Sequence, residues 1–461
     1  MRSTVSVTAV LAFPGYNLPR RVCAAAALTV LLEGCFETAG VLSLADAQRN
    51  FVAPVPSSRA IDPGSSGDYS DAFWNAVADL DLSTSRQVAR TGSERRFVDG
   101  VAALIAGDER MAEMAFSEMV TERSDPTVAA AAQLMFAATL LYEHKWSALS
   151  EFTEATQRGD ADLPGVSGME KWGKAFAGLD PQVISFPRRE VTLPLRVTPV
   201  GTPTVRVRIN GKDYQFWLDT GSSMTVLSSD VAADAHVSVL TKDTLTVATF
   251  AGVAPARPAL LPRMELGSVA ITNSPAIVID SRLMRIHGTA EGVPLSGLPV
   301  DGIIGWDVIR QLDILLDYAS GKATVREPRY LGTIGTSMQN LKWVGKPFIL
   351  LRTKSGATLH LTLDTGAQAS FLNGAILKKA QVTATNSNAR AYGIARTGGK
   401  PAQAVPSLSV DVGGTSIVLR DLIVYNPTSS SLINCDGILG SDIAQFGAIR
   451  IDATNGLFSV G

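Results

Sequence analysis

Two short stretches of the chain place a carboxylate, a hydroxyl and a glycine directly after an apolar run. Asp219-Thr220-Gly221 follows Phe216-Trp217-Leu218, and Asp364-Thr365-Gly366 follows Leu361-Thr362-Leu363. A carboxylate at the end of a buried strand is costly unless it is hydrogen-bonded or used in chemistry. When two carboxyl groups face each other, one keeps a proton and can polarise a carbonyl while the other accepts a proton from water. The two stretches therefore predict half-sites that together activate a water molecule.

The residues around the two stretches repeat at a constant offset of 145 residues (364 − 219). A turn glycine, Gly211 or Gly356, lies eight residues before each aspartate. An apolar pair follows each motif, Val226-Leu227 in the first copy and Phe371-Leu372 in the second. Apolar residues alternate on both sides of the turn, which predicts strand, tight turn and strand in each copy.

A second element also occurs in both copies. Asp301-Gly302-Ile303-Ile304-Gly305 matches Asp436-Gly437-Ile438-Leu439-Gly440 at an offset of 135 residues (436 − 301). The smaller offset predicts about ten additional residues in the first copy, which we expect in a loop around 286–299. Gly305 and Gly440 are expected to let a strand pass close beneath each aspartate loop, where a side chain would collide.

Paired Asp-Thr-Gly loops, each followed by an apolar-apolar-glycine element, resemble the aspartic proteases, and specifically their retropepsin-like branch. The resemblance covers residues from about 190 to 461. It implies two lobes in one chain, 188–326 and 340–461, which form a pepsin-like pseudo-dimer. It further implies an intramolecular catalytic dyad of Asp219 and Asp364, without a cofactor.

The residues beside each aspartate are expected to support the dyad. Gly221 and Gly366 let backbone amides approach the carboxylates, and the hydroxyls of Thr220 and Thr365 lock the two loops together, as the resemblance implies. Ser222 follows the first motif, where the second has an alanine. Its hydroxyl either hydrogen-bonds the nearby carboxylate or only solvates the loop.

Each copy also contains a candidate flap over the cleft. In the first copy it is the hairpin tip at 249–253, which contains Gly252, and in the second it is 392–399, which begins with Tyr392 and Gly393. A glycine-containing tip could move and exclude water when it closes. An extended peptide would pair its backbone with the flap edges. Tyr392 either lies over the dyad or packs on the sheet.

Other polar residues at matched positions are given structural roles. Asp301 and Asp436 begin the glycine elements and are interpreted as turn formers. His360 is expected to face solvent, and Cys435 to be a small buried filler. Four further acids are interpreted as helix caps or turn acceptors: Asp307, Asp442, Asp317 and Asp452.

Residues 69–180 have the pattern of a helical domain, because they are rich in Ala, Met, Leu and Glu with apolar residues three and four apart. Residues 103–108 align with 139–144 at a spacing of 36 (139 − 103), which resembles tetratricopeptide-type hairpins. A plain helical bundle is the alternative. A repeat pair would offer a groove for a protein partner, whereas a bundle would only cap or space the next domain.

The N-terminal residues 1–47 have the order of an export signal, with Arg20-Arg21 before an apolar run at 22–32. Leu32-Glu33-Gly34-Cys35 resembles a bacterial lipoprotein box, which would place a lipid on Cys35, although Glu33 fits the box poorly. Cleavage after Ala45-Asp46-Ala47, or an uncut anchor, are the alternatives. Residues 48–68 are a linker rich in proline, glycine and serine. The leader predicts export to the bacterial cell envelope or periplasm.

Composition excludes several classes of function. The 461 residues are 46% hydrophobic and 18% charged, which suits folded domains with sizeable cores. A formal net charge of −2 gives no electrostatic case for nucleic acid. The four histidines and three cysteines are not spaced as metal ligands, so no metal site is expected.

We therefore expect a multidomain α+β protein, in which a helical domain precedes an all-β, bilobal aspartic-protease fold. The expected function is that of an exported aspartic endopeptidase acting on a peptide or protein. A monomer is expected, because each chain holds both aspartate loops. The alternative is a non-catalytic or weakly active peptide-binding envelope protein with a helical interaction scaffold.

Overall fold

The structure is a computed structural model of the chain. It describes residues 36–38, 69–120, 125–158, 166–199, 201–241, 244–249, 252–290, 293–331, 339–344, 346–390, 401–425 and 432–461. Most of the leader, the linker, and the flap candidates Tyr392 and Gly393 lie outside these residues. Within the described ranges, no helix has the length and apolar character needed to cross a membrane.

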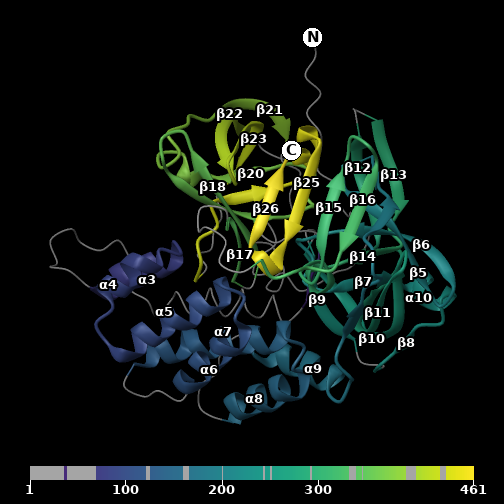
Figure 1. Ribbon diagram of the computed structural model, residues 1–461, viewed down its shortest axis with the longest axis horizontal. Coiled ribbons are helices and arrows are strands. Elements are labelled where there is room, and N and C mark those ends of the chain that lie inside the picture. The colour runs from purple at the N-terminus through teal and green to yellow at the C-terminus, as the bar shows by residue number, and fades with distance from the viewer. Residues whose placement is uncertain are drawn as a thin grey trace.

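Helices occupy the N-terminal part of the described chain and gather at one end of the molecule (Figure 1). Side-chain caps define where several begin: Thr91 and Glu94 form a reciprocal capping box, and Asp108 and Asp125 each accept a backbone N–H of the first turn. The helices are α3 (Tyr69–Ala78), α4 (Leu82–Val88), α5 (Gly92–Ile105), α6 (Glu109–Met119), α7 (Pro126–Tyr142), α8 (Trp146–Arg158) and α9 (Val166–Phe176).

The central helix of this region is α7, which is apolar on every side and packs against α5, α6, α8 and α9. A helix that is apolar all round is stable only when other elements surround it. Close packing elsewhere depends on glycine, because a Cβ on Gly173 of α9 would lie 2.9 Å from the backbone nitrogen of Ser150 in α8. The tetratricopeptide-type repeat stays a prediction.

The first β lobe follows the helices. Two of its strands, β6 and β14, are parallel, and β14 also pairs antiparallel with β7, which places the glycine element between the strands that flank the first aspartate loop. The strands and short helices are β2 (Val183–Ser185), β3 (Val191–Pro194), β4 (Arg196–Val197), β5 (Pro203–Ile209), β6 (Lys212–Leu218), β7 (Thr225–Ser228), α10 (Ser229–Asp234), β8 (Ser238–Val239), β9 (Leu245–Thr249), β10 (Gly252–Leu266), β11 (Val269–Ile279), β12 (Arg285–Ala290), β13 (Val293–Pro299), β14 (Gly302–Ile304), α11 (Trp306–Ile309), β15 (Asp313–Asp317) and β16 (Lys322–Arg326).

The second lobe repeats this arrangement, with β24 parallel to β19 and antiparallel to β20. Its elements are β17 (Leu341–Trp343), β18 (Pro347–Thr353), β19 (Thr358–Leu363), β20 (Phe371–Asn373), η3 (Gly374–Ile376), β21 (Thr385–Arg390), β22 (Pro401–Val412), β23 (Thr415–Tyr425), β24 (Gly437–Leu439), η4 (Ser441–Phe446), β25 (Ala448–Asp452), η5 (Ala453–Asn455) and β26 (Leu457–Val460).

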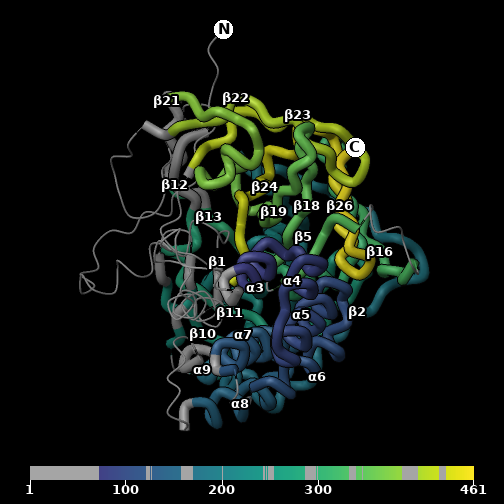
Figure 2. Tube along the Cα trace, turned by 90° about the vertical axis from the view of Figure 1, so that its left-hand side faces the viewer, coloured from purple at the N-terminus to yellow at the C-terminus, as the bar shows by residue number. Residues whose placement is uncertain are grey.

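A separate sheet joins the lobes, in the strand order β26-β25-β15-β16-β3. Its central pairing is antiparallel between β15 of the first lobe and β25 of the second. Figure 2 shows the helices in the lower part of the molecule, below the second lobe and beside β10 and β11 of the first. The predicted fold class, a helical region followed by an all-β, bilobal aspartic-protease fold, is confirmed.

The extra residues of the first lobe form a hairpin rather than the expected loop. Strands β12 and β13 pair antiparallel with each other and form a two-stranded sheet of their own. Proline at 294 and 299 and glycine at 288 and 297 suggested irregular chain. An edge hairpin tolerates these residues, because unpaired backbone groups can face solvent there.

Candidate active site

The two aspartates lie at the centre of the β region, each at the end of a strand. Asp219 follows β6 and Asp364 follows β19, and their side chains are 0% and 1% exposed. The glycine element holds each one in place, since the N–H of Asp219 donates to the carbonyl of Ile304 (3.1 Å) and that of Asp364 to the carbonyl of Leu439 (3.0 Å). The duplicated sequence therefore folds so that two equivalent loops meet.

The two loops are interlocked through their threonines. The N–H of Thr220 donates to Oγ1 of Thr365 (3.0 Å), and the N–H of Thr365 donates to Oγ1 of Thr220 (3.0 Å). Each hydroxyl then donates to the opposite strand, that of Thr220 to the carbonyl of Leu363 (2.9 Å) and that of Thr365 to the carbonyl of Leu218 (2.7 Å). Buried hydrogen bonds of this kind fix the separation of the two carboxyl groups.

Each carboxyl group has one oxygen that accepts backbone N–H groups. Oδ1 of Asp219 accepts from Gly221 (2.9 Å), and Oδ1 of Asp364 accepts from Gly366 (3.0 Å) and Ala367 (2.9 Å). The Oδ2 atoms are buried and receive no donor from another residue in the described part of the chain. Gly366 allows the close approach, because a Cβ there would lie 2.4 Å from Oδ2 of Asp219.

Burial is the largest cause that raises the pKa of both carboxyl groups, and the further causes differ between them. The pKa of Asp219 rises well above its usual range because of burial first and the charge of Asp364 second. Burial raises the pKa of Asp364 to about 6, against the N–H groups of Ala367 and Gly366, which favour its charged form. The two carboxyl groups are coupled, so the pair titrates as a unit and holds one shared proton.

The two glycines of the second element lie directly beneath the loops. A Cβ on Gly305 would lie 2.5 Å from the carbonyl oxygen of Met224, and one on Gly440 would lie 2.5 Å from that of Ala369. The hydroxyl of Ser222 donates to the carbonyl of Met224 (2.8 Å), so it closes the first loop rather than binding the carboxylate. The support residues named from the sequence are thus all placed at the two loops.

The matched acids outside the dyad hold the glycine elements to their neighbours. Asp307 accepts from the hydroxyl of Thr225 (3.3 Å), and Asp442 accepts from the N–H of Ser370 (3.0 Å) and from its hydroxyl (2.7 Å). Burial raises the pKa of Asp307 to about 7. These acids lie in the first turn of α11 and of η4, two residues after each glycine (307 − 305 and 442 − 440).

The remaining acids named from the sequence bind nearby backbone. Asp317 accepts the N–H of Ser320 (2.9 Å), and Asp452 accepts that of Asn455 (3.2 Å), so both terminate turns. Asp301 accepts the N–H of Gln215 (2.9 Å) across the sheet. In the second lobe, Asp436 accepts the backbone N–H of His360 in the equivalent position.

The expectation that His360 faces solvent is wrong. Its side chain is buried and its ring Nδ1 lies 3.9 Å from Oδ2 of Asp436, which also accepts the backbone N–H of His360 (2.9 Å). Burial lowers the pKa of this histidine. The reason is that β19 lies inside an eight-stranded sheet, between β18 and β24, where both of its faces are covered.

The first flap candidate lies on a β-hairpin. Gly252 begins β10 and pairs with Thr249 at the end of β9, so the tip falls at 250–251, which lies outside the described residues. On its other edge β9 pairs antiparallel with β1 (Phe36–Thr38). The second flap candidate is not described.

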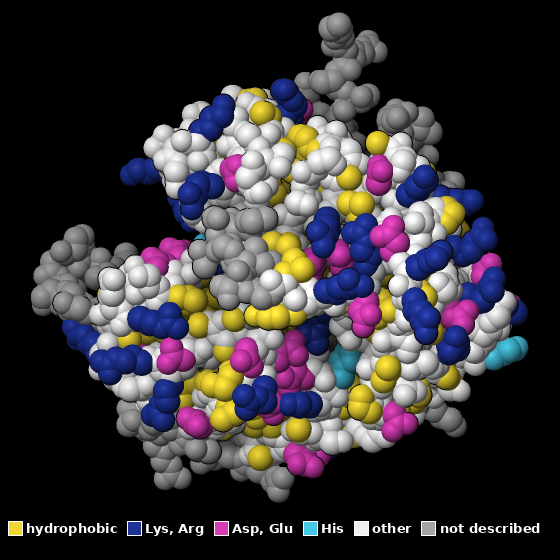
Figure 3. All heavy atoms as spheres, viewed as in Figure 1, with side chains coloured by type: hydrophobic (Ala, Val, Ile, Leu, Met, Phe, Trp, Pro, Cys, Tyr) yellow, Lys and Arg dark blue, Asp and Glu magenta, His cyan; other side chains and the backbone are white. Residues whose placement is uncertain are grey.

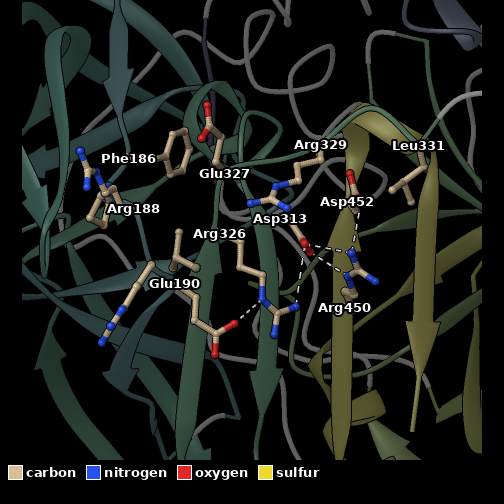
Figure 4. A pocket seen from close by; sticks show the side chains of 13 residues that line it. Phe186, Arg188, Glu190, Asp313, Arg326, Glu327, Arg329, Leu331, Arg450 and Asp452 are labelled. Carbon is tan, nitrogen blue, oxygen red and sulfur yellow. Dashed lines mark hydrogen bonds and ion pairs between the residues drawn. The ribbon is translucent and has the colours of Figure 1, made fainter.

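A charged pocket lies away from the aspartates, on the joining sheet (Figure 4). Arg326 pairs there with Glu190 (2.7 Å), and Arg450 pairs with Asp313 (2.8 Å) and Asp452 (3.5 Å). Figure 3 shows basic and acidic side chains interspersed over this face of the molecule. The charges that line this pocket largely compensate one another. No group of metal-ligating side chains occurs in the described residues.

Sequence reasoning missed one charged residue near the dyad. The positive charge of Lys346 lowers the pKa of Asp364. Lys346 precedes Pro347 at the start of β18, as Thr202 precedes Pro203 at the start of β5. Thr202 reaches the opposite lobe, with its hydroxyl 3.5 Å from the carbonyl of Gly366. The repeated Gly-x-Pro sequence was the signal that could have identified this position.

Two comparisons with known proteins found a similarity. Residues 205–308 match the family model described as aspartyl protease. Among solved structures, the aspartic proteinase from Irpex lacteus is similar at 16% identity, over 59% of this chain and 96% of that chain, with a TM-score of 0.36. A search of curated proteins found no similar sequence. With the two-lobed fold, the family match confirms the predicted resemblance to retropepsin-like aspartic proteases.

The buried dyad makes a prediction about stability. A carboxyl whose folded-state pKa is raised favours folding below its unfolded pKa, and this contribution is lost as pH rises through the folded value, here about 6 for Asp364. We expect Asp364→Asn to raise the free energy of unfolding at pH 7–8 by roughly 1–3 kcal/mol. The gain should disappear near pH 4, as thermal melts at several pH values would reveal.

The matched control is Asp317→Asn, since hydrogen bonds from Ser320 lower the pKa of this exposed turn acid. Its effect should have the opposite sign, with lower stability at neutral pH and no difference well below pH 4. If the Asp364→Asn protein has a lower melting temperature than the parent at pH 8, the buried, ionised carboxyl of Asp364 does not destabilise the fold and the prediction is wrong.

Proposed function

We propose that the chain is an aspartic endopeptidase that hydrolyses peptide bonds with a water held between Asp219 and Asp364. The observation that carries the proposal is the pair of buried Oδ2 atoms without another donor, in loops locked by the Thr220 and Thr365 hydrogen bonds. Two carboxyl groups with one shared proton can act as acid and base at once.

The reaction follows from the unequal proton affinities. Ionised Asp364 removes a proton from the water, whose oxygen attacks the peptide carbonyl carbon, while protonated Asp219 donates its proton to the carbonyl oxygen. The tetrahedral diol then collapses: a proton reaches the leaving nitrogen, the C–N bond breaks, and a carboxylic acid and an amine separate. The loop glycines and threonines act by fixing the carboxyl groups, which lowers the reorganisation needed in the transition state.

The second candidate is a peptide-binding envelope protein with little turnover. A specific feature favours it, because the helices pack closely against the dyad-bearing lobes and could serve as a protein-interaction scaffold. The enzyme is favoured because both half-sites keep the complete set of aspartate, threonine and glycine in register.

Export to a bacterial cell envelope is also proposed, with lipid attachment at Cys35 as one form of it. Support comes from the basic, apolar and small residues of the leader. The mass of the mature N-terminus would decide, since acylated Cys35, cleavage after Ala47 and an uncut leader give different masses. A monomer acting on peptides or proteins, without nucleic acid or a cofactor, completes the proposal.

Hydrolysis of a denatured protein tests the enzyme. Replacement of either aspartate, Asp219→Asn or Asp364→Asn, should reduce kcat/KM by roughly 10²–10⁴-fold, because each removes one proton-transfer partner. Parent activity should rise with pH through about 6, the pKa of Asp364 in the free enzyme. Equal cleavage by the parent and both variants would contradict the catalytic role of the two aspartates. Cleavage by none of the three would favour the alternative function, a peptide-binding protein with little turnover.

A second test concerns the charge of Lys346. Lys346→Gln removes a positive charge that lowers the pKa of Asp364, so the acid side of the pH–activity profile should move to higher pH. Lys378→Gln is the matched control, because this exposed lysine of the same lobe is not among the charges that act on Asp364. A profile that moves to lower pH, or moves equally in both variants, would contradict this role.

A further inference from the structure

The joining sheet carries a row of charged side chains that crosses from one lobe to the other. Asp313 of β15 pairs in register with Asp452 of β25 on one side and with Arg326 of β16 on the other. Arg326 in turn donates to Glu190, which precedes the edge strand β3 (2.7 Å). Residues that pair directly across neighbouring strands present their side chains on the same face of a sheet. The row therefore forms the floor of the charged pocket in Figure 4.

The acids of this floor are already bound. Arg450 of β25 donates from two nitrogens to the two oxygens of Asp313 (2.8 and 2.9 Å), and it lies 3.5 Å from Asp452. A second nitrogen of Arg326 lies 3.9 Å from Asp313. A guanidinium group has five N–H donors in one plane, more than these contacts use. The floor is thus held in place by its own ion pairs and still presents N–H donors.

The arginines at the rim of the pocket differ from those of the floor. Arg188, Arg189 and Arg329 line the pocket and are exposed. Within the described residues, none of these three lies within ion-pair distance of a carboxylate, and the acid beside them at the rim is Glu327. Figure 4 shows Arg188 on the β3 side of the pocket and Arg329 on the side of the second lobe. Positive charge therefore exceeds negative charge at the rim, where a ligand would enter.

Large apolar side chains lie beside the rim arginines. Phe186 and Leu331 line the pocket, and Leu331 and its neighbour Tyr330 are 56% and 79% exposed, the highest values among the large hydrophobic residues of the described ranges. The backbone N–H of Leu331 donates to Asn455 (2.9 Å), which itself donates to the carbonyl of Arg329 (2.9 Å). This segment is thus held against the second lobe. Exposed apolar groups that gather beside a pocket are typical of a binding surface.

The dimensions of the pocket suit a short extended peptide. Its volume is about 380 Å³, which lies within the usual range for a ligand site. From β25 across β15 and β16 to β3 there are three strand spacings, or about 14 Å, which an extended chain spans in about four residues. Arginines stand at both ends of this span, so they require negative charge at more than one place. A run of acidic residues supplies it, and a guanidinium plane binds a carboxylate with two hydrogen bonds.

We propose that this pocket is a docking site for an acidic peptide segment of a partner protein, in which glutamate or aspartate residues flank an apolar residue. The carboxylates bind Arg188, Arg189 and Arg329, and the apolar side chain packs on Leu331 and Phe186. The bound segment contacts residues of both lobes. Because the site lies on the joining sheet, away from the two aspartates, it does not depend on whether the chain hydrolyses peptides.

The test measures the binding of a fluorescein-labelled hexapeptide, with four glutamates around a leucine and a phenylalanine, by fluorescence anisotropy. The full chain carries Asp364→Asn, so that hydrolysis cannot consume the probe. The control ligand is the same peptide with glutamine in place of each glutamate. The acidic peptide should bind at least about tenfold more tightly, with an affinity that falls as salt is added. Equal affinity for both peptides, or no binding of either, would overturn the docking site.

Variants of the rim locate the binding. Arg188→Gln and Arg329→Gln should each weaken binding of the acidic peptide about tenfold, because each removes one charge-assisted contact. Lysine at either position should restore part of the affinity, since it keeps the charge but not the planar pair of donors. Arg420→Gln is the matched control, an exposed arginine of the second lobe that does not line the pocket. An equal loss in this control would mean general attraction between charges and would contradict the site.

The apolar contact is tested with the same probe. Leu331→Gln should weaken binding several-fold, whereas Met114→Gln, which changes a 46% exposed apolar residue of α6 in the helical region, should not. Equal effects of these two variants would contradict the apolar half of the proposal.

Competition identifies the class of ligand. Inorganic phosphate, citrate and vesicles of phosphatidylcholine with phosphatidylglycerol are each added to the parent and to the Arg329→Gln variant. None of them should displace the peptide at the concentration of peptide that gives half-saturation. If phosphate or citrate does so, the pocket binds a small anion. If the vesicles bind in preference to the peptide and Arg329→Gln abolishes this, the pocket contacts a membrane surface. Either result would overturn the peptide site.

Discussion

The interlock of Thr220 and Thr365 is the contact on which the rest of the site depends. Two acids that are less than 2% exposed would normally be driven apart by desolvation and repulsion. Four hydrogen bonds between the loops hold them together, and each bond crosses from one lobe to the other. The joining sheet, through the pairing of β15 with β25, keeps the lobes in the register that these bonds require.

The two nearly identical loops differ in the groups that surround their carboxyl groups. Asp364 accepts two N–H groups at one oxygen, from Gly366 and Ala367, and the charge of Lys346 acts on it as well. Each of these interactions favours the ionised form. Backbone N–H groups of the first loop act on Asp219 in the same sense, so the two acids are similar but not identical in their surroundings.

The sequence alone was sufficient for the parts of the site that are local and duplicated. Asp-Thr-Gly and the glycine elements recur in register, so their positions in the two lobes could be predicted without coordinates. Prediction from the sequence failed where the burial or pairing of a segment depends on which other elements cover it. His360 follows the strand pattern but lies inside the sheet, and the residues at 286–299 form a paired hairpin. Neither packing is encoded in local periodicity.

The relation of the helices to the lobes could not have been predicted for the same reason. Trp217, Ile303 and Val226 alternate as any strand residues do, and nothing in their spacing says whether the exposed face meets water, a peptide or another domain. The structure shows that this face packs against the helices in the first lobe. Val344, Phe348, Leu432 and Ile433 of the second lobe belong to the same core. The helical domain is therefore packed against both lobes, and the spacing of apolar residues along a strand carries no information about such a contact, because it is the same for any buried face.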